Sequence, residues 1–336
     1  MNIERLVARD IKISKLDDEF DHRQNTSWSK IISMGNIVEV TTLESIPLPP
    51  PTQKINKDLY FDKRTGDVFE FKHGETRADN KKGVRQTLAR IRALINCNVV
   101  NPDFCRWLTF TYAENMTDTK RLYKDWDVFR KRFARWCSQN SIDKPEYIAV
   151  VEPQGRGAWH LHVFFIWQHS APFLDNNTVV APLWGHGFTK TKAVSNVDNV
   201  GAYFSAYLGD MPLDEFSALD ADEMSDDVQI VSKEMTDSDG KKISKKIVKG
   251  GRLKLYPVGM NIVRCSRGVK RPDIEVTTYE NAQKKVCDYA QTYHVGYELR
   301  SELKFVDGSS TDKLSNRVYK DYYNKIRKVS QGQGEK

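Results

Sequence analysis

Apolar side chains recur at helical spacing in two stretches of the chain. The stretch Gln86–Asn96 predicts an amphipathic helix, because its apolar residues fall on one helical face. A second stretch predicts a longer helix that ends near Ser138, and Thr117 or Asp118 can cap its N-terminus. The apolar positions are Leu88, Ile91, Leu94 and Ile95 in the first helix and Leu122, Trp126, Phe129, Phe133 and Trp136 in the second.

Four stretches rich in β-branched and aromatic residues predict strands. The second stretch, Tyr147–Glu152, and the third, Trp159–Trp167, are joined by the turn Pro153–Gly157, where glycine supplies positive φ. These two stretches therefore form an antiparallel hairpin. A short helix is predicted over Asp198–Leu208. The order strand, helix, hairpin, strand, helix predicts an α+β fold, in which helices lie on one face of an antiparallel sheet. The predicted strands are Trp107–Tyr112, Tyr147–Glu152, Trp159–Trp167 and Gly187–Val194.

The flanking regions are less regular. Prolines at 47–51 predict an extended segment, and Leu59–Phe71 predicts a small hairpin. Residues 211–250 are strongly charged and predict an exposed, mobile insertion. The stretch Arg252–Arg264 alternates like a strand. Near the end, Lys313–Arg327 has apolar residues four positions apart, which predicts a last helix.

Composition favours a globular protein of a reducing compartment. Hydrophobic residues make up 39% of the 336 residues, which excludes disorder throughout the chain. No apolar run approaches the roughly 18 residues of a membrane span, and the first ten residues lack the apolar core of a secretory signal. The five cysteines contain no CxxC pair, which argues against a disulfide framework and a zinc ribbon. We therefore expect a cytoplasmic protein without a membrane partner.

Charge is unevenly distributed along the chain. The formal net charge is +7, although the segment from Asp210 to Asp227 contains only acidic and no basic charges. The rest of the chain is therefore more basic than the net charge suggests. A basic body with one acidic segment favours a polyanionic partner such as nucleic acid. The acidic residues are Asp210, Asp214, Glu215, Asp220, Asp222, Glu223, Asp226 and Asp227.

Two histidines and a glutamate form a candidate metal site. His160 and His162 alternate on the third predicted strand and so share one face. Glu152 ends the neighbouring strand, and the hairpin can return its carboxylate to the two imidazoles. Two imidazoles and a carboxylate with open coordination positions suit Mg²⁺ or Mn²⁺ near a phosphate.

Two tyrosines on the helix after the sheet form a candidate nucleophile pair. Tyr203 and Tyr207 are four residues apart and so lie on one face, flanked by small residues. A phenol can attack a phosphate that a metal polarises, and the resulting ester conserves the bond energy for rejoining. Their alternative role is packing in the core. Further candidates are Arg156, Lys190 and Lys192 as phosphate contacts, Trp159 and Trp184 as base-stacking residues, and His186 as an assisting residue.

These motifs together resemble the HUH endonucleases, and more narrowly the rolling-circle replication initiators of phages and Gram-positive mobile elements. The resemblance runs over about residues 85–210 and resumes from Arg252 to Gly268. Trp107–Tyr112 is similar to the family's first motif, Val151–His162 to its metal motif and Asn199–Leu208 to its nucleophile motif. The three motifs occur in the family's order, which makes the resemblance specific.

The resemblance implies a ferredoxin-like (RRM-like) sheet with the metal on its central strands. It implies that Tyr203 or Tyr207, with Tyr203 expected to act first, nicks single-stranded origin DNA and leaves a 5′-phosphotyrosine and a free 3′-OH. A host polymerase extends that 3′-OH. The family's lysine before the second tyrosine is Ala206 here, so Lys190 and Lys192 become the candidates to contact the scissile phosphate. No GxxxxGK[ST] motif occurs, so a host helicase is the expected partner for unwinding.

The resemblance also implies a division of the chain. We expect an N-terminal region (1–98) that ends in a helix, an HUH endonuclease domain (99–265) with the charged insertion 211–250, and a partly helical extension (266–336). The roles of 1–84 and of the insertion stay open.

Competing families match less well. Hydrolases of the HIT type need a third histidine where this chain has Phe164. In relaxases the nucleophilic tyrosine precedes the histidines, whereas here both tyrosines follow them. A transposase of the HUH type and a non-catalytic DNA-binding protein on an RRM-like sheet are the alternatives.

Overall fold

The computed structural model divides the chain into two compact units. Unit 1 combines both ends of the chain, Met1–Lys72 and Pro272–Lys336, and unit 2 comprises His73–Arg271. No helix in the described part of the chain has the length and apolar content that crossing a bilayer requires. The structure describes residues 6–16, 21–45, 52–63, 65–71, 81–194, 199–212, 230–236, 242–305 and 314–328.

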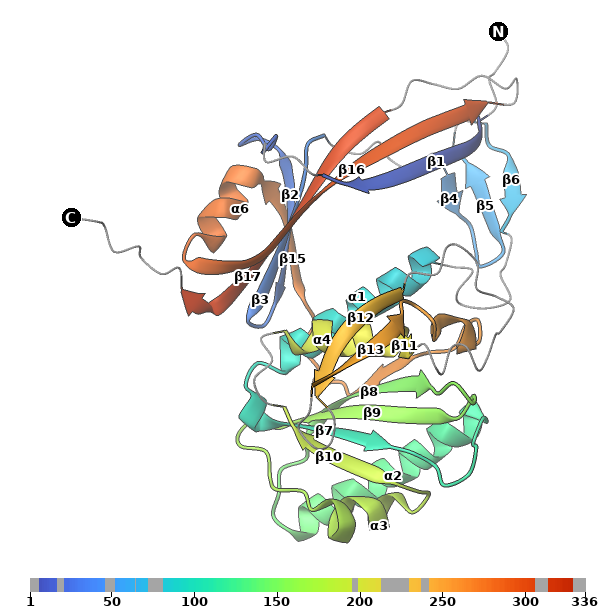
Figure 1. Ribbon diagram of the computed structural model, residues 1–336, viewed down its shortest axis with the longest axis vertical. Helices are drawn as coiled ribbons and strands as arrows, with labels where there is room; N and C mark the ends of the chain where they lie inside the picture. Colours follow the sequence, from blue (N-terminus) through green and yellow to red (C-terminus); the bar gives the residue numbers. More distant parts are fainter. Residues whose placement is uncertain are drawn as a thin grey trace, which may run out of the picture. The chain divides into compact units, whose positions relative to one another are not determined.

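The centre of unit 2 is a five-stranded antiparallel sheet in the order β10–β7–β9–β8–β14 (Figure 1). The four predicted strands are all present, and β8 and β9 form the predicted hairpin. The α+β class and the antiparallel pairing are thus confirmed. The strands are β7 (Cys105–Phe110), β8 (Glu146–Pro153), β9 (Trp159–Ile166), β10 (Thr189–Ala193) and β14 (Val263–Cys265).

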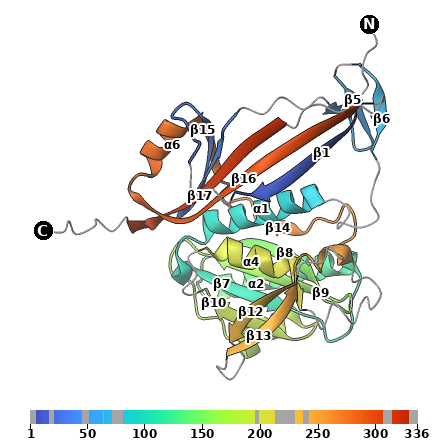
Figure 2. The same ribbon diagram turned by 45° about the horizontal axis from the view of Figure 1, so that its top comes forward.

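Helices cover both faces of this sheet (Figures 1 and 2), so the predicted one-sided arrangement is wrong. α2 (Thr119–Gln139) packs on one face, where the ring centroids of Phe129 and Phe110 lie 4.6 Å apart. α4 (Val200–Gly209) packs on the other face, where the rings of Phe204 and Trp107 lie 5.2 Å apart. Successive residues of a strand point to opposite faces. Because β7 has large apolar side chains on both of its faces, both must be covered.

The three helices predicted in unit 2 are present. α2 ends one residue beyond Ser138, and α4 begins at Val200, within the predicted stretch. Asp118 caps α2, since its side chain accepts hydrogen bonds from the backbone N–H groups of Lys120 and Arg121. α1 (Lys81–Asn98) packs closely against α4. At this contact the N–H of Gly201 donates to Oδ1 of Asn96 at 2.8 Å, and the carbonyl of Arg92 leaves no space for a β-carbon on Gly201. The glycine therefore permits the close approach of the two helices.

The described part of the predicted insertion forms a second small antiparallel sheet in the order β11–β13–β12. Apart from Asp210, the acidic stretch lies outside the described residues. The stretch Arg252–Arg264, predicted to be a strand, forms one only at β14 (Val263–Cys265). The prediction is therefore wrong for most of this stretch. The elements are β11 (Met211–Pro212), β12 (Ile230–Thr236) and β13 (Lys242–Val248), with η2 (Pro102–Phe104), η3 (Asn176–Val180), α3 (Ala181–Trp184) and η4 (Leu253–Leu255) elsewhere in unit 2.

Unit 1 is built on a six-stranded antiparallel sheet in the order β1–β16–β17–β3–β2–β15. α6 (Tyr279–Val286) packs Ala282 and Val286 against apolar residues of this sheet. The predicted small hairpin is confirmed as β5 and β6 of a separate three-stranded sheet. The strands are β1 (Leu6–Lys15), β2 (Trp28–Met34), β3 (Ile37–Leu43), β4 (Thr52–Lys54), β5 (Leu59–Asp62), β6 (Val68–Glu70), β15 (Asp273–Thr278), β16 (Tyr289–Phe305) and β17 (Leu314–Lys328).

The helix predicted near the end of the chain is wrong, because this stretch forms strand β17. Its apolar residues Val318, Tyr322 and Ile326 are four positions apart, and a spacing of four places residues on one face of a helix and equally on one face of a strand. The pattern therefore could not distinguish the two. Pairing with β16 and β3 on its two sides makes β17 a central strand of the sheet.

Candidate functional site

Two histidines and a glutamate meet at the end of the β8–β9 hairpin. His160 and His162 share one face of β9, and Glu152 lies opposite His160 on β8. One ligand atom from each residue lies within 4.8 Å of the other two. Glu152 and His162 are only 1% and 2% exposed, and His160 is half-buried. The structure thus brings together the three side chains that the sequence predicts as metal ligands.

Neighbouring polar groups orient both imidazoles. Nε2 of His162 lies 2.6 Å from Oε2 of Glu152, and because a carboxylate only accepts, the imidazole donates. Nδ1 of the same ring lies 3.1 Å from Oγ1 of Thr109 on β7. Nδ1 of His160 lies 3.3 Å from Nε2 of Gln154. Such secondary contacts fix the orientation of imidazole ligands in metal sites.

A buried arginine completes the group, although sequence reasoning gave it no role. Nε of Arg252 lies 3.1 Å from Oε1 of Glu152. The same guanidinium donates to the carbonyl oxygens of Asp210 and Pro153, both at 2.9 Å. It therefore ties the chain just after α4 to the end of β8. Arg252 lies far along the chain from Glu152 and outside its motif, so no local pattern could have indicated the contact.

Burial and charge set the protonation of this group. Desolvation lowers the pKa of His160 to about 4, despite the opposing attraction of Glu152. Burial alone would raise the pKa of Glu152. The hydrogen bond from His162 and the electrostatic attraction of His162 and Arg252 outweigh it, so the pKa of Glu152 lies below its ordinary value. At neutral pH the group therefore offers a neutral imidazole at His160 and a carboxylate, which are the metal-binding forms.

The donor set suits a divalent cation. Two imidazoles and one carboxylate bind transition ions, and they leave coordination positions for phosphate oxygens. Oε1 of Glu152 is buried and makes no hydrogen bond, although the guanidinium of Arg252 lies beside it. A buried acceptor without a hydrogen bond destabilises the folded protein by about 1–3 kcal/mol. A cation bound to Oε1 would therefore stabilise the folded protein. The group could therefore hold a metal ion.

The predicted tyrosines lie on the helix that covers this face of the sheet. Tyr203 and Tyr207 belong to α4, and they flank Phe204 in the sequence. The ring of Phe204 lies 5.6 Å from that of His162, so α4 packs directly beside the candidate metal-ligating group. Helical geometry puts both tyrosine positions on the same side of the Phe204 position. The side chains of the two tyrosines lie outside the described residues.

Two of the three predicted phosphate contacts share the face of the metal-ligating group. Lys190 and Lys192 of β10 are exposed and lie opposite Thr109 and Trp107 of β7. Nζ of Lys192 lies 5.7 Å from the centre of the Trp107 ring. Arg156 is exposed in the β8–β9 turn, where its Nε donates to Oε1 of Gln154 at 3.2 Å. It therefore contacts the glutamine whose amide lies beside His160.

Both tryptophans predicted to stack on bases are buried, so that prediction is wrong. Trp159 is 4% exposed and Trp184 is 1% exposed. Their indole N–H groups donate to the carbonyls of Thr117 and Thr111. His186 packs against the ring of Trp184, with its Nε2 3.7 Å from Oδ1 of Asp125 on α2. These residues form part of the apolar packing around α2.

An exposed phenylalanine that sequence reasoning missed lies beside the site. Phe188 precedes β10 and is 69% exposed. Its carbonyl accepts hydrogen bonds from the N–H and the hydroxyl of Thr111, which continues the pairing of β10 with β7. By the alternation of strands it lies on the same face as Lys190. The exposure of this large apolar ring is what indicates a binding role, and the exposure of a side chain cannot be read from the sequence alone.

An antiparallel sheet with two histidines and a glutamate beside a tyrosine-bearing helix is suited to metal-assisted phosphoryl transfer. Residues 105–211 match the family model for the replication-associated protein ORF2, which confirms the predicted resemblance to phage replication initiators over this segment. The matched segment runs from β7 to β11 and so contains the candidate metal-ligating group and both tyrosines, whereas unit 1 lies outside it. No curated protein and no solved structure matches the chain.

Proposed function

We propose that unit 2 is an HUH endonuclease that initiates rolling-circle replication by nicking single-stranded origin DNA. A tyrosine of α4, Tyr203 first, attacks the scissile phosphorus through its phenol oxygen. A bond forms between this oxygen and phosphorus, and the bond from phosphorus to the 3′ oxygen breaks. The phenol loses its proton, and the 3′ oxygen gains one and leaves as the 3′-OH. Tyr207 then attacks the regenerated junction in the same way and frees a second 3′-OH. This hydroxyl attacks the phosphorus held by Tyr203, the bond from phosphorus to the Tyr203 oxygen breaks, and the phenol regains the proton, so the displaced strand is closed.

The metal-ligating group supports this proposal. A divalent ion such as Mg²⁺ or Mn²⁺, bound by Glu152, His160 and His162, would polarise the scissile phosphate. Arg252 keeps one carboxylate oxygen of Glu152 in place, and Thr109 orients the ring of His162. These contacts preorganise the three ligands on rigid strands.

The surface around the group supports single-stranded DNA as the substrate. Lys190 and Lys192 lie along β10 on the same face and can contact successive phosphates. The exposed ring of Phe188 can stack on an unpaired base. Within this proposal, the sheet of unit 2 corresponds to a ferredoxin-like core with the ligands on its central pair β8 and β9. A host helicase and a host polymerase act as partners.

The observation that carries the proposal is the placement of α4. This helix contacts His162 through Phe204, and it contains both tyrosines of the family segment. A chain that only bound DNA would not need a buried carboxylate facing two imidazoles beside a helix that contains two tyrosines.

The test uses circular single-stranded DNA that contains the gene's own flanking region, with and without Mn²⁺. We expect a linear product and a protein–DNA adduct that survives boiling in SDS, both dependent on Mn²⁺. The variant Tyr203→Phe/Tyr207→Phe is expected to lose the adduct, whereas the matched control Tyr293→Phe, at a 55% exposed position of unit 1, is expected to keep it. Linear product without adduct would contradict the tyrosine roles. DNA binding without either product would favour the non-catalytic alternative.

A further inference from the structure

Besides the lysines of β10, unit 2 has a basic surface on the side of the sheet that α2 covers. We call it the α2 surface, and it comprises a stripe along α2 and a neighbouring cavity. Lys120, Lys124, Lys131 and Arg135 are all exposed. Their spacing places them on the helical face directly opposite the buried residues of α2. At 1.5 Å per residue the stripe is about 22 Å long, which corresponds to about six base pairs of duplex DNA. The sheet separates this stripe from the metal-ligating group, because Phe110 faces α2 and Trp107 faces α4.

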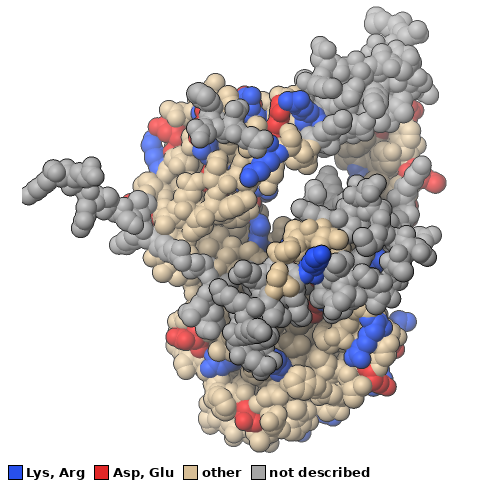
Figure 3. Space-filling view, viewed as in Figure 1, with Lys and Arg blue, Asp and Glu red and all other residues tan. Residues whose placement is uncertain are grey.

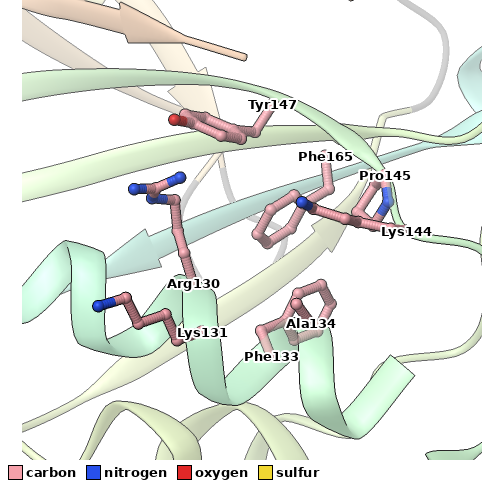
Figure 4. Close-up of a pocket in the computed structure, with 8 residues that line it drawn as sticks. All are labelled: Arg130, Lys131, Phe133, Ala134, Lys144, Pro145, Tyr147 and Phe165. Carbon is pink, nitrogen blue, oxygen red and sulfur yellow. The ribbon is translucent and has the colours of Figure 1, made fainter. Parts of the chain in front are cut away.

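A cavity of about 480 Å³ lies on one flank of this stripe, between α2 and β14. Figure 4 shows an adjoining pocket, which Arg130 and Lys131 from α2, Lys144 before β8 and Tyr147 line together. Arg130, Lys144 and Tyr147 line both spaces, and Arg267 and one acid, Glu146, line the cavity. The positive stripe therefore continues into a concave site.

Most of these cations form no ion pair with a described acid, whereas the neighbouring acids are engaged. Among the described residues, no acid forms an ion pair with Lys131, Lys144 or Arg267. Asp127 pairs with Arg130, and Oε2 of Glu146 accepts a hydrogen bond from the N–H of Gly268 at 3.2 Å. Unpaired like charges repel one another, so an anionic partner would stabilise this surface.

Lys and Arg outnumber Asp and Glu in unit 2, whereas the two kinds are equal in number in unit 1. On the face that Figure 3 shows, basic and acidic side chains are interspersed. The α2 surface differs in that its exposed charges are mainly of one sign. A local excess of basic over acidic side chains indicates a binding surface for a polyanion more directly than the net charge does.

We infer that the α2 surface binds the phosphodiester backbone of duplex DNA. Proteins that bind single strands stack bases on exposed aromatic rings. Here the ring of Tyr147 is covered by the guanidinium of Arg130 at 5.3 Å, and that of Tyr123 by Arg264 at 3.5 Å. A straight row of cations with covered rings fits the regular backbone of a duplex. The choice of DNA as the polyanion rests on the proposed function, but the surface is separate from the nicking site.

The test compares the variant Lys131→Gln/Lys144→Gln/Arg267→Gln with wild type for binding to a short labelled duplex over a range of NaCl concentrations. Each lost phosphate contact lowers the slope of log K against log salt by about 0.9. We expect the slope to fall by about 2 to 3 and the affinity to fall at least about tenfold near physiological salt. The matched control Lys15→Gln/Lys54→Gln/Lys63→Gln removes three exposed positive charges from unit 1 and is expected to bind like wild type.

The inference is overturned if the variant Lys131→Gln/Lys144→Gln/Arg267→Gln keeps the duplex affinity and salt slope of wild type. Equal losses in both triple variants would also overturn it, since the effect would then be one of net charge. A loss as large on a single strand of the same length would reject duplex as the ligand. Absence of nicking by wild type would contradict the proposed function alone, because this binding assay contains no metal.

Discussion

The two units each bury a carboxylate beside a histidine and an arginine, and the comparison shows what sets a metal-binding group apart. Asp321 of unit 1 is fully buried. Its Oδ1 accepts from Nδ1 of His294 at 2.6 Å and from Nε2 of Gln291 at 2.9 Å, and its Oδ2 accepts from Arg23. Both oxygens are thus satisfied by fixed donors. This cluster needs nothing further to be stable.

Glu152 of unit 2 is buried to the same degree but is paired differently. Only Oε2 has a hydrogen bond, and Oε1 relies on the nearby charge of Arg252. A second imidazole, that of His160, lies close by with a depressed pKa. Burial of a charged cluster is therefore not itself a functional signal. Spare ligand capacity, from an oxygen without a hydrogen bond and two converging imidazoles, distinguishes this group from the Asp321 cluster among the described residues.

Breaking the unit 1 cluster should have the largest effect on stability. Asp321→Asn removes the buried anion that accepts from Arg23, His294 and Gln291 and leaves Arg23 paired with the exposed Asp21, and we expect unit 1 to lose about 3 kcal/mol or more. Hydrogen exchange of β3 and β17 measures this loss. The control Asp58→Asn, in an exposed pair with Lys57, is expected to change stability by less than about 0.5 kcal/mol. A change in Mn²⁺ affinity in Asp321→Asn would contradict the separation of the two clusters.

Removing the carboxylate ligand should have the next largest effect. Glu152→Gln is expected to weaken Mn²⁺ binding at least about 100-fold, or about 3 kcal/mol, since the ion loses its only anionic ligand here. Isothermal titration calorimetry measures this affinity. The exposed control Glu280→Gln is expected to bind like wild type. Unchanged Mn²⁺ affinity in Glu152→Gln would show that the three residues do not form the site.

The depressed pKa of His160 predicts a pH dependence of unit 2. Above pH 6.5 the imidazole is neutral in both states and has no effect. Below that value the unfolded chain takes up the proton first, since the folded pKa is about 4, so stability falls with pH. The metal-free protein should lose about 2 kcal/mol more than His160→Gln between pH 7 and pH 5. Chemical denaturation followed by tryptophan fluorescence tests this, because every tryptophan except Trp28 lies in unit 2. Identical pH profiles of the two proteins would rule it out.

The smallest expected effect concerns the orientation of a ligand. Thr109→Val removes the hydroxyl at Nδ1 of His162, and we expect Mn²⁺ affinity to fall about tenfold. The matched control Thr191→Val removes a hydroxyl that bonds Asn176 on the other face of the sheet. It should leave Mn²⁺ affinity unchanged. Equal changes in Mn²⁺ affinity in the two variants would show that Thr109 does not position His162.

Local patterns predicted the central hairpin and the approach of Glu152 to the histidines, because strand alternation and a glycine turn fix that geometry over short distances. They did not predict Arg252 or Phe188, whose roles depend on contacts between distant segments. They also did not show that Val318, Tyr322 and Ile326 belong to a strand, because spacing by four suits both periodicities. The pairing of the two chain ends in unit 1 has no local signal at all.

The residue that carries DNA after the Mn²⁺-dependent reaction identifies the nucleophile of unit 2. The adduct is digested with nuclease and protease, and the modified peptide is sequenced by mass spectrometry. We predict a nucleotide phosphate on Tyr203 or Tyr207, within α4. A nucleotide on any other residue, or nicked DNA with no modified peptide, would contradict the account.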